Sequence, residues 1–283
     1  MRQIRHPGPV AVQRVDVLPV ALQRLDLLLQ PGQNLLESLV GALPAGCTSA
    51  VLTLAGGALS PFAYVMPALS RTTEHAVYFS DRFDADGPVQ LLDACVTFGQ
   101  RNGMPWLHCH ARWTDAEGTP HCGHVLPEQA VLSAPVTASA WLMDGAVFEV
   151  VPDLETRFSL FKPLPLAETG AVDRRALAVR IAPNEDVCSA LEQVCRQHGI
   201  HSATVRGGVG STVGAAFADG RRVEPFVTEL LVRQGQIRPD AQGQPAAEIE
   251  VSLVDHLGGL ANGRLQRGAN PVLVTFELVL EPD

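Results

Sequence analysis

Four of the nine histidines fall in residues 108–124, as His108, His110, His121 and His124. A β-strand places alternate side chains on one face, so His108 and His110 are expected to point the same way. A tight turn at Asp115–Gly118 would bring a third histidine beside them on the returning strand. Three neutral imidazoles around one point form a ligand set for Zn²⁺ or another divalent transition metal, with an open position for water or substrate. The spacing therefore predicts a metal site.

The pairing register of the two strands decides which histidine is the third ligand. One register places His121 opposite Arg112, and a register shifted by one residue places His124 opposite His110. The strand pattern alone leaves both His121 and His124 open. Cys122 lies between them and could add a thiolate, but we interpret it as a small buried apolar residue.

Residues 248–264 repeat the pattern of residues 108–124 without a gap. The turn residues coincide: Asp115 with Asp255, Gly118 with Gly258, and Gly123 with Gly263. The three histidines differ, since the second copy replaces His108, His110 and His124 by Glu248, Glu250 and Arg264. Two carboxylates and a guanidinium can neutralise one another without a metal, so we predict a degenerate second site. His121 corresponds to Ala261, which favours His124 as the third ligand.

The duplication extends upstream, because residues 28–35 resemble residues 180–187 and each segment leads into a helical stretch. We interpret the chain as two copies of one unit. Residues 1–152 carry the histidine site, residues 153–174 connect the copies, and residues 175–283 carry the degenerate site. Asn34 and Asp186 are expected to cap the one principal helix of each copy. The remaining pattern favours mostly antiparallel strands, so the expected fold class is α+β.

Composition narrows the classes of function. Apolar residues make up 46% and charged residues 18% of the chain, which suits a folded protein with a sizeable core. The net charge is −9 and Lys162 is the single lysine. This argues against nucleic-acid binding, which neutralises phosphates with basic side chains. No apolar run is long enough to span a membrane, and the first residues lack a signal-peptide pattern. Because the six cysteines show no disulfide-framework spacing, we expect a cytoplasmic location.

The histidine segment resembles a known family. Residues 107–118, Leu-His-Cys-His-Ala-Arg-Trp-Thr-Asp-Ala-Glu-Gly, followed by Cys-Gly-His at 122–124, resemble the core motif of the plants-and-prokaryotes-conserved (PPC or PCC) domain. Residues 29–36 and 207–211 resemble its opening strand-turn-helix and its glycine turn. The resemblance implies an α+β, sandwich-like unit around an antiparallel sheet, and assembly into homotrimers. Plant members bind DNA through appended AT-hooks, and this sequence has none.

The same fold is shared by α-acetolactate decarboxylase, a duplicated enzyme whose zinc is held by His-x-His and a later histidine. The spacing of His108, His110 and His121 is similar to that triad, so the resemblance keeps His121 open. A related zinc-dependent ester hydrolase also uses such a triad. The chain departs from the family pattern at Cys122, where Gly is usual, and in the second copy, which has lost all three histidines.

An open metal position predicts the kind of chemistry. A metal there can acidify water for hydrolysis of an ester or lactone, or polarise the carbonyl of a keto acid for decarboxylation. Arg112 shares the face of His108 and His110 by parity and is the candidate for holding the carboxylate of a small-molecule substrate. Glu74 is a candidate acid–base group. Arginine and glutamate are, however, both common on solvated surfaces. The alternative is a non-enzymatic, metal-stabilised sensor or assembly module, in which a fourth protein ligand closes the metal shell.

Overall fold

The computed structural model describes residues 2–166 and 175–283, and strands dominate both stretches. Strands hold 62% and helices 7% of the described residues. The described residues form two helices, α1 (Leu35–Ala42) and α2 (Val187–Gln197). The expected α+β class is therefore wrong, and the fold is a large, mostly antiparallel β-structure. The helices have only 8 and 11 residues, whereas the strands reach a length of 18 residues.

The strands fall into three groups along the chain. The first half contains β1 (Val15–Leu29), β2 (Ala50–Ala55), β3 (Ala58–Val65), β4 (Pro67–Leu69), β5 (Val77–Phe79), β6 (Phe83–Asp84), β7 (Val89–Arg101), β8 (Met104–Thr114), β9 (Pro120–Ala134) and β10 (Val136–Asp144). A hairpin follows, made of β11 (Ala146–Pro152) and β12 (Ser159–Pro165). The second half contains β13 (Ala176–Ile181), β14 (Ala203–Ala216), β15 (Arg222–Pro239), β16 (Pro245–Asp255), β17 (Leu260–Arg264) and β18 (Val272–Pro282).

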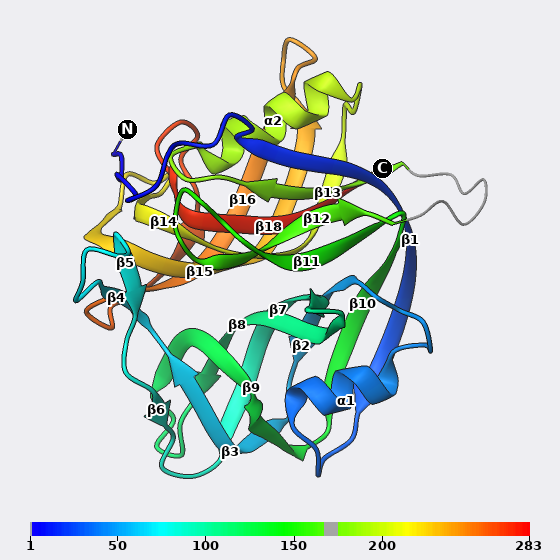
Figure 1. Cartoon of the computed structure of the whole chain (residues 1–283), viewed down its shortest axis with the longest axis vertical. Coiled ribbons are helices and arrows are strands. Elements are labelled where there is room, and N and C mark those ends of the chain that lie inside the picture. The colour runs from blue at the N-terminus through cyan, green and yellow to red at the C-terminus, as the bar shows by residue number, and fades with distance from the viewer. Residues whose placement is uncertain (1, 167–174) are drawn as a thin grey trace.

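A single sheet of 16 described strands runs through both halves, and β4 and β5 form a separate two-stranded sheet. The strand β1 joins the halves. Its residues 15–20 pair with β13 of the second half, and its residues 21–29 pair with β10 of the first half. Figure 1 shows β1 running along one side of the molecule, with the second half above and the first half below.

Both helices begin as their sequences predict. The Asn34 side chain accepts a hydrogen bond from the backbone N–H of Glu37 at 2.9 Å, and Asp186 accepts one from Ser189 at 2.8 Å. These bonds satisfy N–H groups that the first helical turn leaves without partners. Neither helix is long and apolar enough to cross a membrane, and no other described segment is helical.

The two half-sheets face each other across a buried layer, which we call the seam. Its apolar contacts combine side chains of both halves, such as Val51 and Trp141 with Val279, and Cys95 and Cys122 with Leu231. The helices α1 and α2 pack on the two outer faces, away from the seam (Figure 1). Side chains of β8 and β9 that point inward therefore meet residues of the second half.

The expected turn at Asp115 is present and is repeated in the second half. Asp115 Oδ1 accepts hydrogen bonds from the backbone N–H groups of Glu117 and Thr119, at 3.1 and 2.8 Å. Asp255 Oδ1 accepts the equivalent pair, at 2.8 and 3.1 Å. Gly118 has φ +83°, a conformation that glycine adopts at little cost.

The division of the chain at residues 152 and 174 stays a prediction. The described part of the expected connection contains strand β12, and residues 167–174 lie outside the described residues.

Candidate metal centre

The structure brings three of the four candidate histidines together. His108 and His110 on β8 and His124 on β9 each offer one ligand atom, and these atoms lie within 4.8 Å of one another. The pairing register explains the group, because His110 lies directly opposite His124. Within residues 2–166 and 175–283, this is the one group of His, Cys, Asp or Glu side chains with such converging atoms.

Hydrogen bonds to the second half determine which nitrogens of the two β8 histidines carry protons. The carbonyl oxygen of Leu230 can only accept, so His110 Nδ1, 2.8 Å away, donates to it. Glu277 Oε2 lies 3.0 Å from His108 Nδ1 and, as a carboxylate oxygen, accepts in the same way. A neutral imidazole has only one N–H, so both Nε2 atoms present lone pairs. The two Nε2 atoms lie 3.1 Å apart. A metal ion between them, or a proton on one Nε2 that makes the contact a hydrogen bond, removes the repulsion of the lone pairs.

Burial keeps two of the imidazoles neutral. Burial, with a contribution from His108, lowers the pKa of His110 to about 3. Burial and the neighbouring His108 and His110 lower the pKa of His124 well below its usual value. Metal ligands must be unprotonated, so both side chains are in the binding form at neutral pH. The buried Nδ1 of His124 has no hydrogen-bond partner.

Two glutamates of the second half complete the surroundings of the histidines. Glu277 on β18 is 1% exposed and accepts from His108, as described above. Glu229 on β15 places Oε2 4.0 Å from His110 Nε2, and this buried oxygen has no hydrogen-bond partner. Desolvation raises the pKa of Glu229 to about 8. The sequence interpretation missed both residues, although each is the one charged residue in an apolar stretch, 226–232 and 272–280, which is unusual unless the carboxyl group has a role.

This donor set fits a divalent transition metal of zinc type. Two ligands of a tetrahedral zinc with bonds of about 2.0–2.1 Å lie roughly 3.3 Å apart, close to the 3.1 Å between the Nε2 atoms of His108 and His110. Glu277 and the Leu230 carbonyl hold the opposite ring nitrogens, as second partners of metal-bound histidines commonly do. Glu229 adds an unpartnered carboxylate oxygen close to the same point.

His121 lies on the other face of β9 and outside the group. Its Nε2 is 2.9 Å from Asp115 Oδ2, and its ring stacks on Trp113. Cys122 faces the seam and is 4% exposed among apolar neighbours. Burial raises the pKa of its thiol, which disfavours the thiolate that a metal would need.

The two candidate catalytic residues lie away from the histidine group. Arg112 follows His110 on the same face of β8, but its Nε donates to Asp93 Oδ1 at 2.8 Å, and its side chain lines a different pocket. Glu74 is exposed and lines a surface pocket beside the β4–β5 hairpin. Neither residue lines a pocket that reaches His108, His110 or His124.

Two pockets reach the histidine group from either side. The apolar pocket touches His108, His110 and Glu229, and its other walls are Pro67, Val77, Tyr78, Phe79, Phe158, Leu160, Gly210, Ser211, Val227, Thr228, Leu273, Val274 and Thr275. The polar pocket touches His108, His124 and Glu277, and Arg101, Glu128 and Gln129 also line it. Phe79 and Phe158 line both pockets. Phe79 also packs edge-on against His124, with ring centroids 5.1 Å apart.

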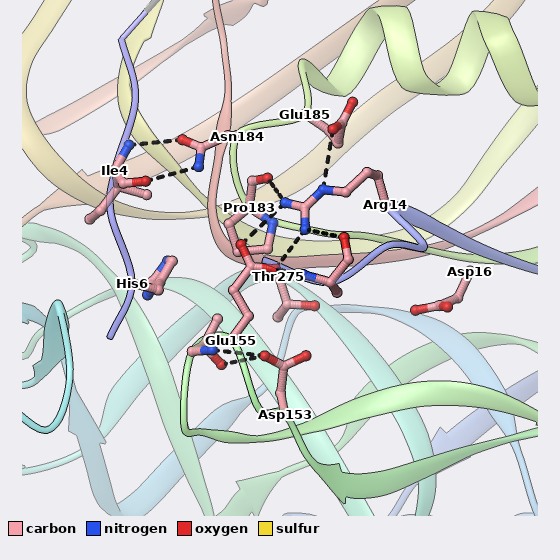
Figure 2. Close-up of polar contacts among 12 residues, drawn as sticks. Ile4, His6, Arg14, Asp16, Asp153, Glu155, Pro183, Asn184, Glu185 and Thr275 are labelled. Atoms are coloured by element: carbon pink, nitrogen blue, oxygen red, sulfur yellow. Dashed lines mark hydrogen bonds and ion pairs between the residues drawn. The ribbon is translucent and has the colours of Figure 1, made fainter. Parts of the chain in front are cut away.

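A buried polar network holds the loop that carries Phe158. Asp153 accepts from the Thr156 backbone N–H at 2.9 Å and lies 3.2 Å from Arg180 Nη2. Figure 2 shows the neighbouring Glu155 beside the guanidinium of Arg14, which reaches on to Pro183 and Glu185. The network thus joins the N-terminal segment, the loop before β12 and the second half.

The corresponding residues of the second copy form an ion pair, as expected. Arg264 Nη1 lies 3.1 Å from Glu248 Oε1, and Arg264 pairs with Glu250 across strands β16 and β17. Glu248 and Arg264 are more than half exposed. The residues of the second copy that correspond to the three histidines thus form a solvated charge cluster.

Two solved structures are similar to about half of this chain. The plant- and prokaryote-conserved (PPC) protein of Pyrococcus horikoshii is 16% identical, covering 52% of this chain and 96% of its own, with a TM-score of 0.41. A metal-containing protein of Archaeoglobus fulgidus is 15% identical, covering 57% of this chain and 99% of its own, with a TM-score of 0.39. No curated protein is significantly similar to the chain.

The family comparison concerns the second half. That the chain shares its fold with α-acetolactate decarboxylase stays a prediction. Residues 169–282 match the family model of the Plants and Prokaryotes Conserved (PCC) domain, which confirms the expected resemblance for that part of the chain.

Proposed function

We propose that the protein is a metal-dependent enzyme that acts on a small carbonyl compound, as a hydrolase or a decarboxylase. Zn²⁺ or a similar divalent metal is held by His108, His110 and His124. The observation that carries the proposal is the pair of Nε2 lone pairs that approach to 3.1 Å, with both Nδ1 atoms committed to acceptors in the second half. A divalent metal at the histidines would accept both lone pairs.

When bound, the metal would polarise a substrate carbonyl and acidify a water molecule. The chain's own groups have separate roles. Glu277 orients His108 through its Nδ1–H, and Glu229 can hold or release a proton at its unpartnered Oε2 beside the substrate. Phe79 and Phe158 line both pockets and would contact a substrate in either of them.

A second candidate function rests on Glu229. If its Oε2 acts as a fourth ligand instead of an acid–base group, the metal shell is closed by protein atoms and the site is structural. Such a metal would join the two half-sheets across the seam, because Glu229 belongs to the second half and the histidines to the first. The protein would then be a metal-stabilised module without catalysis.

Metal analysis of the purified protein tests the proposal. We expect one metal ion per chain in the wild type and none in the double variant His108→Ala/His110→Ala. The matched control is His198→Ala/His201→Ala, which removes two exposed histidines and should keep the metal. Unchanged metal content in the first variant would refute the assignment.

A substrate screen separates the two candidate functions. Esters, lactones and keto acids are offered to the zinc-loaded protein, with His108→Ala/His110→Ala as the inactive control. Turnover supports the enzyme. A closed metal shell with no exchangeable water, together with no turnover, supports the structural role. A homotrimer and a cytoplasmic location remain proposals, which light scattering and cell fractionation would test.

A further inference from the structure

The apolar pocket has a wall chemistry that selects one kind of substrate group. Apart from the two histidines, Glu229 is the only charged residue that lines it among the described residues. Three of the four hydroxyl groups in its walls already form hydrogen bonds: Ser211 with Val274 N, Thr228 with Thr212 O, and Thr275 with Arg180 Nε. The fourth hydroxyl belongs to Tyr78, which is 48% exposed. The described walls of the pocket therefore offer no lysine or arginine for an anionic group, and most of their side chains are apolar.

The far wall of the pocket is rigid and apolar. Val77, Val227 and Leu273 are 2%, 1% and 0% exposed and pack together with Ile4 and Val213. The pocket has a volume of about 60 Å³. Because one water-sized group occupies about 10–15 Å³ on this scale, the pocket holds roughly four to six non-hydrogen atoms. These side chains, His110 and Glu229 all line the pocket, which is partly open to solvent.

We propose that the apolar pocket binds an uncharged aliphatic chain of about four to six carbons, attached to the carbonyl that reacts at the histidines. The substrates are then short-chain aliphatic esters or lactones, and the reaction is their hydrolysis. Water adds its oxygen to the acyl carbon, the bond from that carbon to the alcohol oxygen breaks, and the alcohol oxygen takes up a proton. This inference rests on the proposed function and names its substrate class.

The test uses hydroxamates, which chelate zinc and carry a variable tail. Binding of acetohydroxamate, butanohydroxamate, hexanohydroxamate and dodecanohydroxamate to the zinc-loaded protein is measured by calorimetry. We expect the affinity to rise about fourfold for each added methylene while the tail fits the pocket. The gain should stop at about six carbons. Succinohydroxamate, which has a charged tail, should bind more weakly than butanohydroxamate.

A pair of valine variants locates the effect. Val77→Ala enlarges the pocket and should move the preferred tail length upward by about one carbon. Val89→Ala makes the same change at a valine that is 1% exposed in the first-half core, away from the pocket, and should leave the preference unchanged.

The outcomes distinguish a failure of the pocket inference from a failure of the proposed function. If acetohydroxamate binds but the affinity is independent of tail length and charge, the pocket inference is overturned and the proposed function stands. If the zinc-loaded protein binds no hydroxamate, the open metal position is refuted, and the pocket inference with it.

Discussion

Replacing Glu277 with Gln measures how much the second half contributes to the metal centre. The carboxylate is 1% exposed and accepts from His108 Nδ1 at 3.0 Å. Glutamine keeps the size and an acceptor oxygen but removes the negative charge that strengthens His108 as a ligand. Changes to such partners typically reduce metal affinity by about 10–100-fold, which corresponds to roughly 1.4–2.7 kcal/mol. We expect a loss in this range.

The assay is a competition between the protein and a chromophoric chelator for Zn²⁺ at pH 7. Glu128→Gln is the matched control, because Glu128 lines the same polar pocket but is exposed and forms no hydrogen bond or ion pair with the described residues. It should bind zinc as the wild type does. Thermal unfolding of the metal-free proteins shows whether Glu277→Gln has folded normally.

Wild-type zinc affinity in a folded Glu277→Gln variant would refute the reasoning about His108. An equal loss in Glu277→Gln and Glu128→Gln would refute it as well, since the effect would then come from overall charge and not from the hydrogen bond to His108.

Two further predictions concern residues around the centre. His121→Ala should leave zinc affinity unchanged within about twofold, because the ring is held by Asp115 on the other face of β9; a tenfold loss in the chelator assay would return His121 to the ligand set. Arg180→Met should reduce the free energy of unfolding in urea by about 3 kcal/mol, the lower end of the range for breaking a buried ion pair, because Lys162 remains as a second partner of the buried Asp153. Burial alone would raise the pKa of Asp153, but the Thr156 donors, Arg180 and Lys162 outweigh it and hold the pKa below its usual value. This carboxylate therefore stabilises the fold above its unfolded pKa and loses that contribution as the pH falls through its folded pKa. Without Arg180 the loss should begin at a higher pH.

The control for the Arg180 variant is Arg24→Met. Arg24 pairs with Asp26, and both side chains are more than 60% exposed. Such a pair contributes about 0–1 kcal/mol. Equal destabilisation of the two variants, or coincident acid-unfolding curves for Arg180→Met and the wild type, would contradict the role given to the buried network.

The local part of the site could be predicted because its signals are close together in the chain. Alternation places His108 and His110 on one face, and the Asp115 turn fixes the return of β9. The register remained ambiguous by one residue, so His121 and His124 could not be separated by the strand pattern. The comparison with Ala261 in the second copy favoured His124, the histidine that joins the group in the structure.

The distant part of the site could not be predicted. Glu229 and Glu277 meet the histidines only because the half-sheets face each other, and no local pattern encodes that packing. The fold class was missed for a related reason. Two short helices with clear caps, at Asn34 and Asp186, suggested a larger helical share than the long strands leave.

The shared strand β1 has a consequence for the order in which the chain can mature on the ribosome. Its residues 15–20 need β13, whose last residue is Ile181, before their backbone amides find partners. At a synthesis rate of about 5–20 residues per second, that wait lasts roughly 10–30 s. During this interval the nascent chain carries an unsatisfied strand edge that can capture neighbouring chains. Chaperone engagement with this stretch during the interval would therefore protect the yield of folded protein, and a pause in translation before β13 would lower it.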